Sequence, residues 1–227
     1  MHTIEIYKSL QGESSFAGLS CVFVRMAGCN LRCAWCDSEY TFKGGAPKTH
    51  EKVIEEVRRL MKPPGLVEIT GGEPMLQERE VVPLMRSLLD EGFTVLLETS
   101  GERPLAAVPD AVHKIVDVKC PSSGEGGKFR VENLDALTQR DEVKFVLASR
   151  EDYDFAVAFV REHRLNEIAG EVIFSPAFRK DASGSRDAAN CLVDPKELAE
   201  WMLADNIPAR LGFQIHKFIW EPQTREV

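Results

Sequence analysis

The sequence lacks the features that would place the protein in a membrane, outside the cell or on a nucleic acid. No apolar run approaches the roughly 18–20 residues that a transmembrane helix needs. The first residues, Met1 to Glu5, lack the basic and then apolar pattern of a signal peptide. Lys and Arg number 28 against 36 Asp and Glu, and this acidic balance does not favour nucleic-acid binding. We therefore expect a cytoplasmic protein that binds neither a membrane nor a nucleic acid.

Paired cysteine motifs are also missing, although the chain has six cysteines. A structural zinc site normally uses four ligands, often in two C-x2-C pairs, and no second pair is present here. Cys29, Cys33 and Cys36 form a C-x3-C-x2-C array instead, while Cys120 and Cys191 are isolated. In a chain that is not exported, these thiols are expected to stay reduced. A catalytic zinc held by three cysteines remains an alternative, although such a site would usually recruit His or Glu.

Three thiolates on one loop are typical of an iron–sulfur centre. Such clusters are held by cysteine thiolates, and a four-iron cube has four irons to ligate. Three cysteines therefore leave one iron open to a ligand from outside the protein. Because a reaction needs an open iron and a structural cluster does not, the array predicts a reactive 4Fe-4S cluster on Cys29, Cys33 and Cys36.

Apolar runs alternate with amphipathic stretches along the rest of the chain. We expect strands at 3–7, 20–26, 66–70, 93–98, 113–118, 142–147, 171–176 and 210–217, and helices at 50–61, 78–91, 151–163 and from 194 onward. This alternation predicts an α/β fold with a mostly parallel sheet. About six βα units are too few for a closed eight-stranded barrel, so we predict a partial, open barrel. It would form a single domain over 1–227, with a short N-terminal strand and loop extension.

The cysteine array resembles that of the radical S-adenosylmethionine (SAM) superfamily. Gly71-Gly72-Glu73-Pro74 after the third expected strand resembles the GGEP motif of that superfamily, which holds the SAM amino group. The stretches Leu10–Glu13, Phe23–Arg25 and Asp37–Ser38 narrow the resemblance to the 7-carboxy-7-deazaguanine synthase family. The resemblance implies that SAM chelates the fourth iron. An electron from the cluster then cleaves SAM to methionine and a 5′-deoxyadenosyl radical.

The resemblance also implies a reaction of the deazapurine and queuosine pathway. The substrate would be 6-carboxy-5,6,7,8-tetrahydropterin, and the radical would abstract its C6 hydrogen. The ring would then contract with loss of ammonia to 7-carboxy-7-deazaguanine, and SAM would be regenerated. The family further implies Mg2+, a homodimer and an external electron donor of the flavodoxin type. Ser38 stands where the family often has a Thr that donates to Mg2+, a metal that usually keeps waters and takes substrate oxygens.

Site residues are carried over from the resemblance position by position. Arg25 would capture the substrate carboxylate, since a guanidinium suits bidentate contact with that group. The remaining substrate contacts would come from Leu10, Gln11, Gly12 and Thr99. The residues implied for SAM binding are Trp35, Cys36, Asp37, Gly71, Gly72, Glu73, Gly101, Lys119 and Ser122.

Four residues keep open roles. Lys144 interrupts an apolar strand, so it is expected to point into the barrel toward a carboxylate. Glu98 is expected either to bind the ribose of SAM or to form an ion pair. His216 is either a proton donor or a structural histidine, and Cys120 lies outside the cysteine array. No residue is assigned a catalytic role.

Two other functions are compatible with the cysteine array. One is an activating enzyme that installs a glycyl radical in a partner protein; the Leu10–Glu13 loop and Arg25 argue against it. The other is a non-catalytic electron carrier, which would need neither the GGEP motif nor a full α/β domain.

Overall fold

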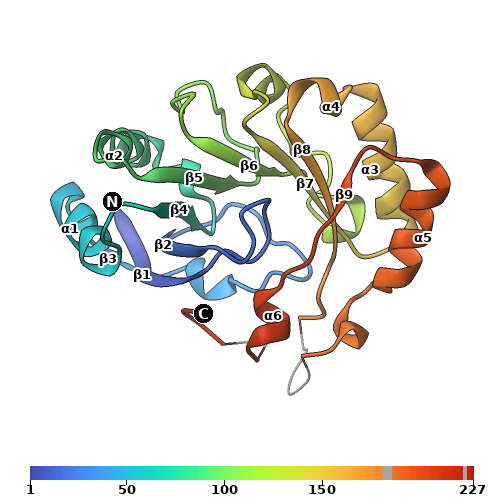
Figure 1. The fold of residues 1–227 in the computed structure, drawn as a ribbon, viewed down its shortest axis with the longest axis horizontal. Coiled ribbons are helices and arrows are strands. Elements are labelled where there is room, and N and C mark those ends of the chain that lie inside the picture. The colour runs from blue at the N-terminus through green and yellow to red at the C-terminus, as the bar shows by residue number, and fades with distance from the viewer. Residues whose placement is uncertain (181–185, 222–223) are drawn as a thin grey trace.

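One curved sheet organises the protein. The computed structural model describes residues 1–180, 186–221 and 224–227. Within these ranges nine strands pair in the order β3-β1-β2-β4-β5-β6-β7-β8-β9 (Figure 1). They are β1 (His2–Leu10), β2 (Ser20–Met26), β3 (Ala46–Pro47), β4 (Leu66–Gly71), β5 (Thr94–Thr99), β6 (His113–Asp117), β7 (Glu142–Leu147), β8 (Glu171–Pro176) and β9 (Arg210–Leu211). From β2 to β9 all neighbours are parallel, whereas β1 is antiparallel to both β2 and β3.

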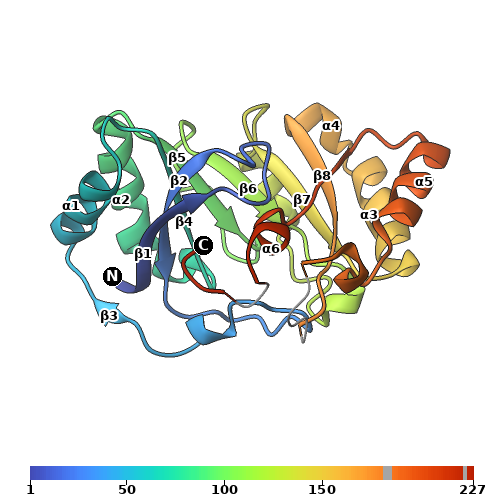
Figure 2. The ribbon, with the colours of Figure 1, turned by 60° about the horizontal axis from the view of Figure 1, so that its bottom comes forward.

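Helices cover the outer face of the sheet. These outer helices are α1 (His50–Leu60), α2 (Glu78–Asp90), α3 (Arg150–Glu162), α4 (Leu165–Ile168) and α5 (Pro195–Asp205), and the short helix α6 (His216–Ile219) lies elsewhere. Helices α1 and α2 flank one end of the sheet and α3 to α5 the other, while α6 and the C-terminus lie at the open side (Figures 1 and 2). Thr49 caps α1 by accepting a hydrogen bond from the Lys52 backbone N–H. No helix within the described ranges is long and apolar enough to cross a membrane.

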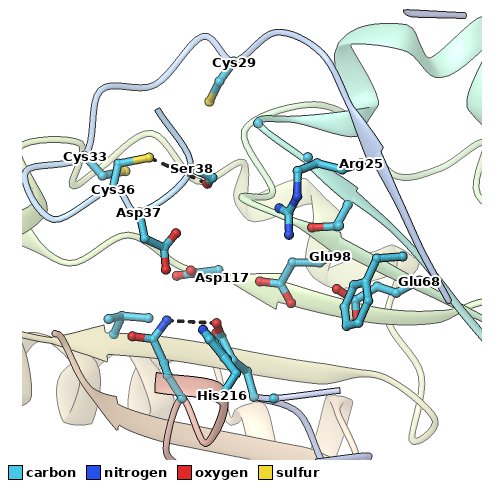
Figure 3. A pocket seen from close by; sticks show the side chains of 18 of the residues that line it. Arg25, Cys29, Cys33, Cys36, Asp37, Ser38, Glu68, Glu98, Asp117 and His216 are labelled. Atoms are coloured by element: carbon cyan, nitrogen blue, oxygen red, sulfur yellow. Dashed lines mark hydrogen bonds between the residues drawn. The ribbon is translucent and has the colours of Figure 1, made fainter. Parts of the chain in front are cut away.

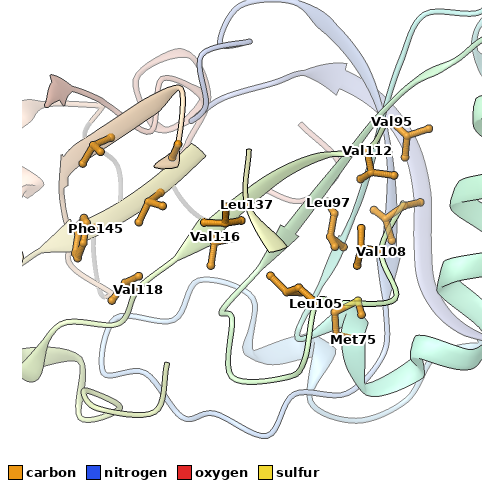
Figure 4. Packing of buried hydrophobic residues seen from close by; sticks show 14 of the residues in the cluster. Met75, Val95, Leu97, Leu105, Val108, Val112, Val116, Val118, Leu137 and Phe145 are labelled. Carbon is orange, nitrogen blue, oxygen red and sulfur yellow. The ribbon is translucent and has the colours of Figure 1, made fainter. Parts of the chain in front are cut away.

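The two faces of each central strand have different partners. Val95, Leu97 and Val116 lie among the buried apolar residues of the main core, which is filled largely by the outer faces of the strands and by the helices (Figure 4). The alternate residues of the same strands face inward, because successive side chains of a strand point to opposite faces. Among them, Leu96 and Ile115 belong to a separate small apolar cluster. The interior of the curved sheet therefore has a largely apolar floor, interrupted at the β7 side by the buried Glu142, which pairs with His113.

Two residues closer to the carboxyl ends of the strands, the next inward-facing side chains are charged. Glu68 on β4, Glu98 on β5, Asp117 on β6 and Lys144 on β7 follow this rule. The loop 11–19 closes the opposite end of the open barrel, where Ser15 donates its backbone N–H to Glu142 at the start of β7. The fold thus provides a largely apolar floor and a layer of charge above it.

The predicted open α/β fold is confirmed, and the main differences lie in the first and last strands. The first strand runs from His2 to Leu10 rather than over 3–7. The strand expected at 210–217 is wrong beyond Leu211, and His216 begins α6. The reason is a tertiary contact: Ile215 donates its backbone N–H to Gly12 in the loop 11–19 instead of continuing the sheet.

Candidate active site

A cavity of about 410 Å³ lies over the charged layer. It is lined by the cysteine loop, the carboxyl ends of β4 to β7, part of the loop 11–19 and residues 224–227. In parallel α/β folds the loops after the strands converge at this edge and carry the functional groups. Figure 3 shows the cysteine loop on one side of the cavity, Glu68 and Glu98 on the other, and Asp117 between them.

The three cysteines of the array all line this cavity as free thiols. Their loop starts directly after β2 and is held by Gly28, whose backbone N–H donates to Thr41 and whose carbonyl accepts from Glu73. Gly72 lies against this loop. A Cβ atom there would lie 2.2 Å from the Gly28 carbonyl oxygen and 2.7 Å from the Cys29 Cβ, so only glycine fits.

The donor set fits an iron–sulfur cluster better than a single metal ion. Among the described residues, no group of three or more His, Cys, Asp or Glu is arranged to hold one ion. A cluster offers each thiolate its own iron, so the three sulfurs need not converge on one point. Burial raises the pKa of the Cys33 thiol to about 11, so the free thiol keeps its proton until a metal displaces it. Cys120 is buried and its Sγ lies 3.8 Å from the Val118 carbonyl oxygen, outside the array.

Glu73 of the Gly-Gly-Glu-Pro loop lies behind the cavity wall. The side chain is fully buried, and both carboxylate oxygens accept hydrogen bonds within the protein. The donors are Thr99 Oγ1 at 2.8 Å, the Ser100 backbone N–H at 2.9 Å, Ser100 Oγ at 2.7 Å and the Met75 backbone N–H at 3.0 Å. These bonds fix the turn after β4 against the turn after β5.

Arg25 makes one end of the cavity cationic. Its Nε donates to Glu5 Oε1 at 2.9 Å, and a second nitrogen donates to the Tyr7 hydroxyl at 2.9 Å. Tyr40 also donates to Glu5, at 2.7 Å. A guanidinium has five N–H donors, so these contacts hold Arg25 in place and leave donors for a ligand.

Lys144 lies at the centre of the acidic end. Its Nζ is 2.6 Å from Glu13, 2.7 Å from Glu98 and 3.9 Å from Asp117. The side chain is 3% exposed, so the prediction that Lys144 points into the barrel toward a carboxylate is confirmed. Glu98 was expected either to bind the ribose of SAM or to form an ion pair, and its contact with Lys144 is such an ion pair.

The carboxyl groups around Lys144 differ in acidity. Burial alone would raise the pKa of Glu13, but the charges of Lys144 and His216 and the hydrogen bond from Lys144 together hold this pKa at about 2. Burial raises the pKa of Glu98 to about 8 and that of Glu68 to about 7. Several carboxylates near one ammonium cannot all ionise cheaply, so the group keeps a proton near neutral pH. Asp117 Oδ1 is buried and has no hydrogen-bond partner among the described residues.

Leu10, Gln11 and Gly12, at the end of β1 and the start of the loop 11–19, also line the cavity. Gln11 donates its side-chain N–H to Glu68 at 2.9 Å and accepts from the backbone of Glu13. Gly12 lies against His216, and a Cβ atom at Gly12 would be 2.3 Å from His216 Nδ1. Burial lowers the pKa of His216. The loop and α6 therefore shape this side of the cavity together.

Most of the other predicted site residues also line the cavity. Trp35, Asp37, Ser38 and Lys119 do so, as do Cys36, Gly71, Gly72 and Thr99. Asp37 pairs with Lys217 of α6 at 2.7 Å, and Lys119 pairs with Asp117 at 2.6 Å. The Ser38 hydroxyl lies 3.8 Å from Cys36 Sγ (Figure 3).

Three of the residues that were predicted to bind SAM do not line the cavity in the part of the chain that the structure describes. Glu73 lies behind its wall, as described above. Gly101 packs against Phe129 and Val116, so that a Cβ atom there would be 2.7 Å from each. Ser122 is exposed, and its hydroxyl lies 3.0 Å from the Ser149 hydroxyl on the outer side.

Sequence analysis missed several residues of the site. Glu68 is the one charge within its strand, the same signal that identified Lys144, whereas the strands of Glu5 and Asp117 contain further charged residues, Lys8 and Lys114. Applied to every strand, this signal would have found Glu68, but it would not have separated Glu5 from Lys8 or Asp117 from Lys114. Arg225 also lines the cavity, and its place in the tail carries no such signal.

Comparison with known proteins agrees with this geometry. The family model of the Radical SAM superfamily matches residues 23–122. The chain is similar to the 7-carboxy-7-deazaguanine synthase of Koribacter versatilis, with 63% identity over the whole of both chains. It is 40% identical to the enzyme of the same name from Chlorobaculum tepidum, over 98% of this chain and 96% of the relative.

Solved structures show the same fold. The crystal structure of QueE from Escherichia coli superposes with a TM-score of 0.72 at 21% identity, and the match covers 93% of each chain. A radical SAM methyltransferase from Sphaerobacter thermophilus matches with a TM-score of 0.57 at 18% identity, over 86% of this chain and 66% of the other. From the full-length identity to curated relatives and the cysteine loop beside the cavity, we conclude that the chain belongs to the 7-carboxy-7-deazaguanine synthase family of radical SAM proteins.

Proposed function

We propose that the protein converts 6-carboxy-5,6,7,8-tetrahydropterin to 7-carboxy-7-deazaguanine with loss of ammonia. One observation carries the proposal: a three-cysteine loop borders a cavity that is cationic at Arg25 and acidic at Glu68 and Glu98. The substrate has a matching polarity, with a carboxylate at one end and ring N–H donors at the other. The relatives that bear the name of this activity support the same assignment.

Cys29, Cys33 and Cys36 would hold a 4Fe-4S cluster with one open iron. When bound, the cluster and SAM supply the radical that removes a hydrogen atom from the substrate. The walls beside the cysteine loop would receive SAM through Trp35, Cys36, Asp37, Gly71, Gly72 and Lys119. Glu73, Gly101 and Ser122 would act from behind this wall, Glu73 by holding the Gly71–Gly72 turn against β5.

The protein's own part is to hold the substrate in one orientation. Arg25 would receive the carboxylate, and its contacts with Glu5 and Tyr7 keep the guanidinium from rotating. Leu10, Gln11, Gly12 and Thr99 would line the ring. Glu68 and Glu98 can accept from ring N–H groups when ionised. Such positioning is the main contribution a protein makes to a reaction whose chemistry belongs to the cofactor.

Ser38 would contribute one hydroxyl ligand to Mg2+. Mg2+ in proteins usually keeps several waters and takes one or two ligands from the protein besides substrate oxygens, so a single hydroxyl at the cavity wall is compatible with that role. The family assignment further supports a cytoplasmic homodimer reduced by a flavodoxin-like electron donor.

The test is a product analysis under anaerobic conditions. Reconstituted, reduced protein is incubated with SAM and the carboxytetrahydropterin, and deazaguanine and deoxyadenosine are quantified by mass spectrometry. We expect deazaguanine from the wild type. Cys33→Ala should lose iron and all SAM cleavage, while Cys191→Ala, which removes a buried thiol outside the cavity, should keep both. Deoxyadenosine without deazaguanine would favour an activating enzyme, and an absence of SAM cleavage would favour an electron carrier.

A further inference from the structure

Glu5 is bonded to two arginines from opposite ends of the chain. Arg25 donates from Nε to Glu5 Oε1, and Arg225 donates from a terminal nitrogen to Glu5 Oε2, each at 2.9 Å. The Glu5 side chain is 3% exposed, and Arg225 lies 220 positions away from it in the sequence. One buried carboxylate therefore brings two guanidinium groups together at the same end of the cavity.

A third contact fixes the orientation of Arg225. Its guanidinium lies over the Tyr40 ring at 4.0 Å from the centroid. Tyr40 itself donates to Glu5 Oε1 at 2.7 Å, so the ring that supports Arg225 is tied to the carboxylate that pairs with it. Arg25, Tyr40 and Arg225 all line the cavity.

The charges of this cluster leave room for one anion. Two arginines and one glutamate sum to a net charge of +1, and Tyr7 and Tyr40 are neutral. A guanidinium has five N–H donors, and Glu5 and Tyr7 occupy only part of each set. An arriving carboxylate would neutralise the cluster and could accept from both guanidinium groups, an arrangement that suits planar anions.

We propose that Arg225 is a second binding residue for the substrate carboxylate, held beside Arg25 by Glu5 and Tyr40. This rests on the proposed function, and it assigns to the C-terminal tail a part in selecting carboxylated over uncarboxylated pterins. Arg25 reaches the carboxylate from β2, and Arg225 reaches it from the tail.

The test compares two ligands that differ by the carboxylate. Reconstituted protein with SAM is titrated with 6-carboxypterin and with pterin, and binding is followed by ligand fluorescence. Arg225→Gln should weaken 6-carboxypterin binding roughly 10-fold, the loss expected for one charge-assisted contact, and change pterin binding less than about twofold. Arg225→Lys should lie between the wild type and Arg225→Gln. In turnover, Arg225→Gln should raise KM for the carboxytetrahydropterin by a similar factor and leave kcat within about twofold.

Arg210→Gln is a matched control. Arg210 and Arg225 are both 54% exposed, and each pairs with a glutamate, Arg210 with Glu171 at 2.6 Å outside the cavity. This control should bind both ligands as the wild type does. Equal losses of both ligands in Arg225→Gln, or no loss of 6-carboxypterin, would overturn the assignment. If the wild type makes deazaguanine and Arg225→Gln has the same affinity for 6-carboxypterin and the same KM, only the role of Arg225 is wrong. If the wild type makes no deazaguanine, both proposals are wrong.

Discussion

Single charged residues inside apolar strands decide what the cavity can bind. A charge buried in a sheet is costly unless a partner compensates it. Arg25 has Glu5 as its partner, and Lys144 has Glu13 and Glu98. Glu68 has only a neutral donor, Gln11, at hydrogen-bond distance among the described residues. Ionisation of Glu68 should therefore cost stability, because no cation among the described residues lies at hydrogen-bond distance to compensate its charge.

The stability of the protein should depend on pH through Glu68. Its pKa is about 7 in the folded protein, above the usual 4.5, because burial disfavours the charged form. The unfolded chain therefore releases this proton at lower pH, and the folded state loses stability as the pH rises from 5 to 8. Glu68→Gln cannot ionise and so does not show this loss. The difference in free energy of unfolding between Glu68→Gln and the wild type should therefore shift by about 2 kcal/mol in favour of the variant from pH 5 to pH 8, measured by urea denaturation.

The control is a glutamate on the surface. Glu55 is exposed on α1, so Glu55→Gln should shift the free energy of unfolding by less than about 0.5 kcal/mol at both pH values. A difference between Glu68→Gln and the wild type that stays constant from pH 5 to pH 8 would show that Glu68 does not titrate in this range.

At the scale of elements, the loop 11–19 is an irregular segment on which the cavity depends. It leaves β1, crosses the end of the barrel and is bonded to Glu142 on β7 and to Ile215 before α6. Its position is set by contacts with distant elements rather than by a strand or helix of its own. Small changes in it should therefore affect substrate binding more than folding.

Gly12→Ala tests this expectation. The added Cβ would lie 2.3 Å from His216 Nδ1, so the loop or α6 must move. Because a displacement of about 1 Å at a binding site can cost up to 100-fold in activity, we expect kcat/KM for the pterin to fall by roughly 10- to 100-fold. Steady-state kinetics under anaerobic conditions provide the measurement.

Gly18→Ala, in the same loop, separates this effect from backbone strain. Gly18 has a φ of +91° and nothing within 4 Å of an added Cβ. The substitution should cost about 1 kcal/mol of stability through strain, with kcat/KM kept within about twofold. Equal kinetic losses in both variants would mean that the loop is sensitive to any change, and not to the contact with His216.

At the scale of the whole molecule, Lys144 joins parts that are far apart in the sequence. Its ammonium group links the loop 11–19, β5 and β6 to β7. Removing one partner of a buried charge group leaves the others uncompensated. We expect Lys144→Met to destabilise the protein by about 3–5 kcal/mol, measured by urea denaturation.

Two further variants make this prediction specific to charge. Lys196 pairs with Glu200 on the surface of α5 and is 84% exposed, so Lys196→Met should cost less than about 1 kcal/mol. Adding Glu98→Gln to Lys144→Met should restore part of the lost stability, because it removes one uncompensated carboxylate. A double variant no more stable than Lys144→Met would attribute the loss to packing instead.

Much of the architecture followed from the sequence because it depends on local rules. The cysteine spacing predicted three thiols on one loop, and all three line the cavity. The alternation of apolar runs and amphipathic stretches predicted the parallel sheet, because strands buried on both faces must be apolar. Lys144 was predicted to point inward because a lone charge in such a strand needs a partner.

Only the tertiary structure decided which distant residues share the cavity. The carboxylate of Glu73 faces the turn after β5, Ser122 faces Ser149, and His216 begins a helix where a strand was expected. Arg225 lies beside Arg25 although 200 positions separate them in the sequence. Spacing and periodicity describe neighbours along one element, whereas these contacts depend on how separate elements pack, and that is determined by the free energy of the whole fold.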